Sequence, residues 1–140
     1  MALDTSNYIL GAKSRLRLAH VHQDLVLVVG RAIDLTSVDF SVLEGLRTVE
    51  RQIELINAGA SRLTDPTKSR HVANDSGVCH AVDLGAYVGG SIRWDWPLYD
   101  QIAVAMKQSA DDLNIKIEWG GDWRTFRDGP HYQLPNRLYP

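Results

Sequence analysis

The sequence predicts a single α+β domain that spans residues 1–140. A chain of 140 residues fits one hydrophobic core, because cores of this size bury about two-thirds of the surface that the unfolded chain exposes. Segments with helical periodicity and segments with strand periodicity follow one another along the chain. The sequence also contains no internal repeat, linker or low-complexity tract that would divide it.

The N-terminal half contains two segments with helical spacing and one with strand alternation. Apolar residues recur at mostly helical spacing over 14–33 and stop before an Asp-Leu-Thr-Ser segment, which predicts one long first helix. Residues 38–45 alternate in polarity and end at a glycine, as a half-buried strand would. Helical spacing returns over 48–58 before the next glycine, so Arg47 lies at the junction between strand and helix.

The C-terminal half alternates strands with one helix. Residues 59–70 are rich in Ser, Thr, Asp and Pro and predict a loop. Residues 80–88 alternate as a second strand that ends at two glycines, and a Trp-Pro pair opens a helix over 96–113. A short strand over 115–119 is broken by two further glycines, and 128–134 is expected to be a last strand or extended segment.

Composition and charge exclude two classes of function. The hydrophobic fraction of 44% and the charged fraction of 23% are ordinary for a soluble domain, and no stretch is long and apolar enough to span a bilayer. A formal net charge of -2 with scattered Lys and Arg gives no electrostatic footprint for a phosphate backbone. We therefore expect neither membrane insertion nor a nucleic-acid partner.

The cysteine content and the N-terminus indicate a reducing compartment. Cys79 is the only cysteine, so an internal disulfide is impossible. The start Met1-Ala2-Leu3-Asp4 lacks the basic residues and apolar run of a secretion signal. We expect the chain to fold in a cytoplasm.

Histidines and aspartates gather in three strings: Ser69-Arg70-His71, His80-Ala81-Val82-Asp83 and Asp128-Gly129-Pro130-His131. Imidazole nitrogen and carboxylate oxygen are good zinc ligands, and two imidazoles with one carboxylate leave a fourth tetrahedral position for water, as in catalytic sites. Such a water has a pKa of about 7, and Asp128 remains as a proton carrier. The strings predict a mononuclear zinc site, although spacing alone does not decide which residues are the ligands.

Several strings, taken in order, resemble the M15 family of zinc peptidases: Glu44-Gly45-Leu46-Arg47-Thr48, Ser69-Arg70-His71, His80-Ala81-Val82-Asp83-Leu84, and Trp119-Gly120-Gly121-Asp122-Trp123 followed by Asp128-Gly129-Pro130-His131. The chain is most similar to the L-alanyl-D-glutamate endopeptidases found as bacteriophage endolysins, and the resemblance covers nearly its whole length. It implies a small antiparallel sheet with flanking helices, as in the D-Ala-D-Ala carboxypeptidase and Hedgehog-like fold.

The resemblance also implies a role for each matched residue. His71, Asp83 and His131 would bind one Zn²⁺, and Asp128 occupies the place of the family's catalytic carboxylate. Arg47 would stabilise the oxyanion or hold a substrate carboxylate, which suits a permanent planar charge. The family's serine before the first ligand corresponds to Ser69, whose hydrogen bond would help to fix the site.

One departure from the family pattern leaves alternatives open. The segment 72–82, which separates His71 from Asp83, is longer than the corresponding segment of the compact S-x-H-x-x-G-x-A-x-D pattern. It contains the turn signal Asn-Asp-Ser-Gly, which indicates a surface insertion that returns Asp83 to the metal. In another register, His80 or Asp75 would replace Asp83 as a ligand.

The function implied by the resemblance is zinc-dependent hydrolysis of the L-alanyl-D-glutamate bond of peptidoglycan stem peptides, leading to lysis of the bacterial host. The absent signal predicts that the protein accumulates in the host cytoplasm and reaches the wall through a holin-type pore. We also expect a monomer and no separate wall-binding domain. Two alternatives are a D,D-carboxypeptidase or D,D-dipeptidase and a non-catalytic, zinc-stabilised binding module.

Several other polar and aromatic residues have simpler interpretations. His20 and His22 stand two apart on the expected helix and so point in different directions, which disfavours a joint metal site. Packing or hydrogen bonding is the favoured role for His80 over metal binding. We expect Trp119 in the core and Asp122 as a turn or cap residue.

Overall fold

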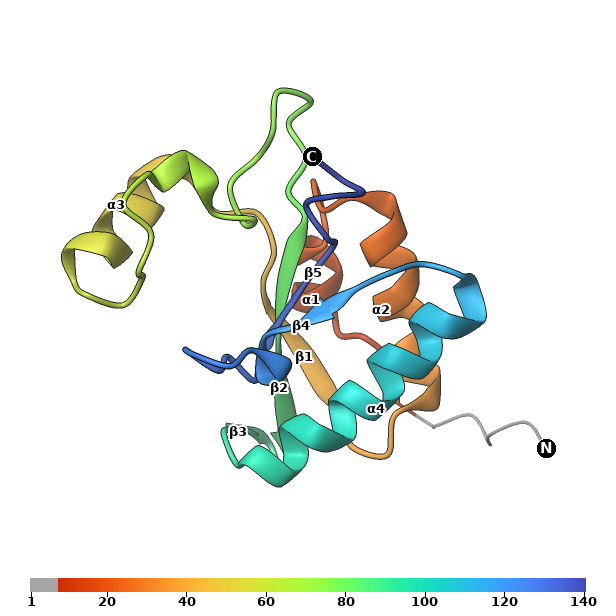
Figure 1. Ribbon diagram of the computed structural model, residues 1–140. Helices are drawn as coiled ribbons and strands as arrows, with labels where there is room; N and C mark the ends of the chain where they lie inside the picture. The colour runs from red at the N-terminus through yellow and green to blue at the C-terminus, as the bar shows by residue number, and fades with distance from the viewer. Residues whose placement is uncertain (1–7) are drawn as a thin grey trace.

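A five-stranded antiparallel sheet lies at the centre of the protein (Figure 1). The computed structural model describes residues 8–140, so the expected lack of a secretion signal at Met1–Asp4 lies outside the described residues. The strands are β1 (Phe40–Glu44), β2 (Ala81–Val88), β3 (Ser91–Arg93), β4 (Glu118–Trp119) and β5 (His131–Gln133). Their order is β1-β2-β5-β4, and β3 pairs with the end of β2. The predicted α+β class with a small antiparallel sheet is confirmed.

Helices flank this sheet. They are α1 (Ala12–Arg17), α2 (Gln23–Leu35), α3 (Val49–Asn57) and α4 (Trp96–Leu113), with the short 3-10 turns η1 (Pro66–Lys68) and η2 (Gly120–Asp122). Figure 1 shows α2 and α4 on one side of the sheet, whereas α3 and η1 extend beyond the other side. The buried Ser109 hydroxyl of α4 donates a hydrogen bond to the carbonyl of Val28 in α2 at 2.7 Å, which ties the two covering helices together.

The alternation along β2 separates the core from the opposite face of the sheet. Val82 and Leu84 are fully buried in the hydrophobic core, with Tyr132 of β5. Because successive side chains of a strand point to opposite faces, Asp83 projects from the other face. That face is therefore available for polar side chains.

The predicted helix over 14–33 is wrong, because the chain forms two helices there. His20 adopts a left-handed backbone with φ of 67°, and Val21 forms a bridge with Cys79. His22 then caps α2, since its Nδ1 accepts a hydrogen bond from the amide of Asp24 at 3.0 Å. The apolar spacing continues across the break because residues on both sides of it face the same core.

The remaining elements agree with the sequence except at one hairpin and one shortened strand. The predicted strands 38–45 and 80–88 and helices 48–58 and 96–113 are confirmed, whereas the strand expected over 115–119 contains only its last two residues. Strand β3 was missed. Gly89 and Gly90, with φ of 61° and 85°, form the tight turn that returns β2 into β3. Among the described residues, no helix has the length and apolar character needed to cross a bilayer.

Candidate metal centre

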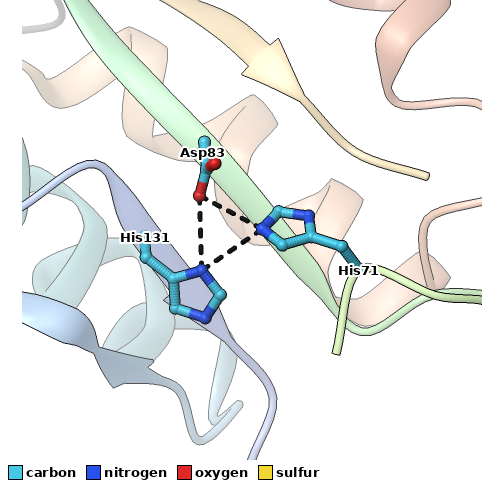
Figure 2. Close-up of side chains that lie close together, drawn as sticks. All are labelled: His71, Asp83 and His131. Carbon is cyan, nitrogen blue, oxygen red and sulfur yellow. Dashed lines mark hydrogen bonds and ion pairs between the residues drawn. The ribbon is translucent and has the colours of Figure 1, made fainter. Parts of the chain in front are cut away.

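Three side chains that are far apart in the sequence meet on the polar face of the sheet (Figure 2). His71 Nε2 lies 3.2 Å from Asp83 Oδ1 and 3.2 Å from His131 Nδ1. His131 Nδ1 lies 3.3 Å from Asp83 Oδ1. Both imidazoles are buried, and the Asp83 side chain is half-buried. The structure thus brings together the three residues predicted as metal ligands.

The sheet and the loop after η1 place these residues. Asp83 on β2 and His131 on β5 are directly paired across the two strands, so they share one face. His71 lies outside the sheet, where its carbonyl accepts the amide hydrogen of Arg47 at 2.8 Å. The Ser69 hydroxyl accepts the amide hydrogen of His71 at 3.2 Å, so the expected hydrogen bond of Ser69 is present.

The outer nitrogen of each imidazole has its own acceptor. Nδ1 of His71 lies 2.8 Å from the carbonyl oxygen of Gly45, which can only accept, so this nitrogen carries the hydrogen. Nε2 of His131 lies 2.8 Å from Oε1 of Gln133, and donation there leaves Nδ1 unprotonated. Both inner nitrogens therefore present lone pairs to the centre, as metal-binding histidines do.

The charges of the cluster favour a cation at its centre. Although burial raises the pKa of Asp83, the adjacent side chains of His131 and His71 hold that pKa far below the usual range. Burial works against a charged His131, yet the neighbouring Asp83 raises its pKa. Two ligand atoms bound at about 2.0–2.1 Å to a tetrahedral zinc lie about 3.3 Å apart, and the three separations here are 3.2, 3.2 and 3.3 Å. The residues fit zinc in spacing and in chemistry.

Arg47 reaches the edge of this cluster from the start of α3. Its Nη2 lies 3.9 Å from Asp83 Oδ2, the oxygen that faces away from the histidines. Nε donates to Glu44 Oε1 at 2.6 Å, Nη2 also contacts Glu44, and Nη1 donates to Gln52 Oε1 at 2.7 Å. Two side chains therefore hold the guanidinium in one orientation beside Asp83.

Asp128 stands in a turn that two hydrogen bonds and two close packing contacts support. Its amide donates to the carbonyl of Gly120 at 3.0 Å, and a side chain at Gly120 would collide with the Asp128 backbone. Trp119 Nε1 donates to the carbonyl of Gly129 at 2.8 Å, and the Tyr99 ring packs against the same glycine. The Trp-Gly-Gly string thus serves to shape the Asp128 turn.

The Asp128 carboxylate has no hydrogen-bond partner within residues 8–140. Although the residue keeps solvent exposure, desolvation by its surroundings raises the pKa of the carboxyl, and the negative charge of Asp83 raises that pKa further. A carboxyl in this setting is suited to taking up and releasing a proton.

All five predicted site residues line one open cavity of about 660 Å³: Arg47, His71, Asp83, Asp128 and His131. Its walls are the segment that follows α3 and the segment between η2 and β5. In Figure 1 these two segments extend on the same side of the sheet. The cluster is therefore accessible to a substrate of peptide size.

The alternative ligands lie elsewhere. His80 is buried against the rings of His22 and Tyr139, with ring centroids 5.6 and 6.4 Å away, so the packing role expected for it is confirmed. Burial, with the charge of Arg70, lowers the pKa of His80 to about 4. Asp75 is exposed in the inserted loop.

The inserted loop is closed by one side chain. The carboxamide oxygen of Asn74 accepts the amides of Ser76 and Val78 at 2.9 and 3.1 Å, and Gly77 has a φ of 77°. The loop is a surface excursion, as expected, and it returns the chain to β2 with Asp83 in the cluster.

The other expectations for single residues are mixed. His20 and His22 do not share a helix, as described above. Trp119 is buried in the core, as expected. Asp122 belongs to the η2 turn and pairs with Lys107 at 2.8 Å.

Sequence reasoning assigned no role to Glu44, Gln52 or Gln133. Gln133 follows His131 by two positions in a strand, so the side-chain alternation was a signal that it shares the face of that histidine. Glu44 lies within the matched string around Arg47 and three positions before it. No local pattern marks Gln52, which is completely buried and contacts Arg47 only through the fold.

The fold is that of an endopeptidase already known from a crystal structure. The L-Ala D-Glu endopeptidase ChiX of Serratia marcescens matches with a TM-score of 0.85 and 44% sequence identity, over 96% of each chain. The family model for phage L-alanyl-D-glutamate peptidases matches residues 6–134. The chain belongs to the phage L-alanyl-D-glutamate peptidase family.

Curated relatives agree with this assignment. The L-alanyl-D-glutamate peptidase of Escherichia phage T5 is 34% identical over 123 residues, covering 87% of this chain and 86% of the phage protein. The peptidoglycan L-alanyl-D-glutamate endopeptidase CwlK of Bacillus subtilis is 30% identical over 106 residues, which covers 71% of this chain and 63% of that protein.

Proposed function

We propose that this chain is a zinc-dependent endopeptidase that hydrolyses the L-alanyl-D-glutamate bond of peptidoglycan stem peptides. The observation that carries the proposal is the convergence of His71 Nε2, Asp83 Oδ1 and His131 Nδ1 within 3.3 Å of one another, in a cavity that Asp128 also lines. Membership of the peptidase family supports the bond that is cleaved. Residues 1–140 would form one catalytic domain.

The three convergent atoms would hold the zinc ion. When bound, zinc supplies Lewis-acid activation of the water and of the amide carbonyl. Gly45 and Gln133 keep the two imidazoles in the tautomers that leave the inner nitrogens free. Asp83 places negative charge between the two rings and offsets the positive charge of the ion.

Asp128 would carry the proton. Its carboxylate takes the proton from the attacking water and then delivers it to the amine nitrogen of the departing glutamate. The raised pKa of Asp128 makes its carboxylate a stronger base towards the attacking water than an ordinary aspartate, and the carboxyl then holds the proton that the leaving amine takes up. The absence of another hydrogen-bond partner among the described residues supports this role.

Arg47 would stabilise the negative charge that develops on the carbonyl oxygen. Its planar guanidinium is oriented by Glu44 and Gln52 before the substrate arrives. Such preorganisation reduces the cost of reorientation during the reaction.

We expect Gln52→Leu to lower kcat about tenfold with little change in KM, because the variant removes a hydrogen bond to a charged group that acts in the transition state. Steady-state kinetics on a stem peptide measure both constants. Gln101→Leu, at an exposed position of α4, is the matched control and should leave both unchanged. A rise in KM alone would instead assign Arg47 to binding a substrate carboxylate, and unchanged constants would contradict the positioning by Gln52.

Mass spectrometry of purified peptidoglycan incubated with the protein tests the proposed function directly. We expect fragments that end at L-alanine and begin at D-glutamate, and we expect them to disappear after treatment with a chelator and to return when Zn²⁺ is added. Loss of terminal D-alanine would indicate a D,D-carboxypeptidase instead. Zinc binding without any cleavage would indicate a binding module.

The cellular role that we propose is lysis of a bacterial host by a monomer that accumulates in the host cytoplasm. A holin-type pore would then give it access to the wall. Lysis upon expression without a pore-forming partner would contradict this part of the proposal.

A further inference from the structure

The cavity carries more positive than negative side chains, although the chain as a whole has a formal net charge of -2. Its lining contains only two carboxylates, Asp83 and Asp128. The cationic residues of the lining are Arg47, Arg62, Lys68, Arg70 and Arg127. A concave surface of one charge concentrates ligands of the opposite charge.

Two of these arginines are already engaged within the protein. Arg47 pairs with Glu44. Arg70 donates to the carbonyls of Leu134 and Tyr139, both at 2.8 Å, and so holds the C-terminal segment. Neither of them has its full charge available for a ligand in the outer part of the cavity.

Arg62 and Arg127 differ, because neither forms an ion pair with a carboxylate in the described part of the chain. Arg62 lies over the ring of Phe126, with its guanidinium carbon 3.1 Å from the ring centroid. Arg127 lies over Trp96 at 4.2 Å and donates through Nε to the carbonyl of Gly121 at 2.9 Å. An aromatic ring that stacks under a guanidinium fixes the orientation of the guanidinium plane. The nitrogens at the edge of the guanidinium then remain free to donate to a planar acceptor such as a carboxylate.

The two arginines come from opposite walls of the cavity. Arg62 belongs to the segment after α3, where the neighbouring Ser61 accepts a hydrogen bond from Gln52 at 2.9 Å. Arg127 directly precedes Asp128 on the other wall. The Arg62 guanidinium reaches across to Phe126, the residue next to Arg127, and both oriented guanidinium groups line the cavity in which the substrate would lie.

We propose that Arg62 and Arg127 form a subsite for the free carboxylate of the glutamate that follows the cleaved bond. This inference rests on the proposed function, which places glutamate on the leaving side. Glutamate has two carboxyl groups, so one remains free when the other continues the peptide. Asp128 repels a carboxylate in this cavity, and the two guanidinium groups offset that repulsion. Lys68 adds charge, but within residues 8–140 no hydrogen bond or ion pair orients its ammonium group.

Two synthetic peptides test the subsite. They contain the same L-alanyl-D-glutamate bond and differ only in whether the free carboxyl of the glutamate is a carboxylate or a carboxamide. We expect the wild-type protein to cleave the carboxylate peptide with a kcat/KM at least about tenfold higher, as the loss of one charge-assisted hydrogen bond would give. In the double variant Arg62→Gln/Arg127→Gln, the ratio of the two kcat/KM values should fall towards one.

Arg124→Gln is the matched control, because Arg124 is exposed on the same segment and does not line the cavity. Its ratio should equal that of the wild type. Each single variant should lower the ratio part of the way, and the single variants provide the test if the double variant does not fold. Equal cleavage of both peptides by the wild type, or an unchanged ratio in the variants, would overturn the subsite. Failure of the wild type to cleave either peptide would instead overturn the proposed function.

Discussion

The Asp83→Ala variant is expected to lose zinc binding and peptide hydrolysis together. Asp83 Oδ1 lies 3.2 Å from His71 Nε2 and 3.3 Å from His131 Nδ1, so its removal leaves two buried imidazoles without the carboxylate that offsets a cation. Because metal activation contributes several kcal/mol, we expect kcat/KM to fall at least about a thousandfold. Metal content by inductively coupled plasma mass spectrometry and kinetics on a stem peptide measure the two losses.

Asp75→Ala and His80→Gln are the controls for this variant. Both residues were alternative ligands in the sequence, and the structure places them outside the cluster. Each variant should bind one zinc ion per chain, as the wild type is expected to do. Retention of zinc in Asp83→Ala together with its loss in either control would show that the ligand set is wrong.

Asp128→Asn is expected to reduce kcat about 10²- to 10⁴-fold while zinc stays bound, because a positioned general acid and base contributes that much. Asparagine keeps the size of the side chain and cannot carry the proton. The main-chain contacts of the turn with Gly120 and Trp119 do not involve the replaced group. Metal analysis and single-turnover kinetics distinguish a lost proton transfer from a lost metal.

Asp122→Asn provides the comparison on the same segment. Asp122 is exposed and pairs with Lys107 at 2.8 Å, so its variant should keep zinc and hydrolysis. If Asp128→Asn were as active as this control, the proton would have to be carried by another group. If it lost zinc, Asp128 would be a ligand and not the proton carrier.

Local patterns were sufficient for most of the secondary structure. The alternation over 80–88 distinguished buried Val82 and Leu84 from Asp83, and the Trp-Pro pair marked the start of α4. The hydrophobic spacing over 14–33 wrongly predicted one continuous helix. Such spacing indicates which residues face the core, but it does not reveal a break in the backbone between them. The pairing of Val21 with Cys79 that causes this break joins segments almost sixty positions apart.

The sequence by itself determined the α+β class, the family resemblance and the five candidate residues, because hydrophobic periodicity and ordered motifs are properties of the chain. Only the tertiary structure decided that Asp83, and not His80 or Asp75, meets the two histidines. It also decided which ring nitrogens carry hydrogens and which residues hold Arg47. These features depend on the pairing of β2 with β5 and on acceptors such as Gly45 and Gln52. The contacts of Asp83 with His131 and of His71 with Gly45 join distant parts of the chain, and the contacts of Arg47 with Glu44 and Gln52 depend on the side-chain conformations that burial selects, so no local pattern contains this information.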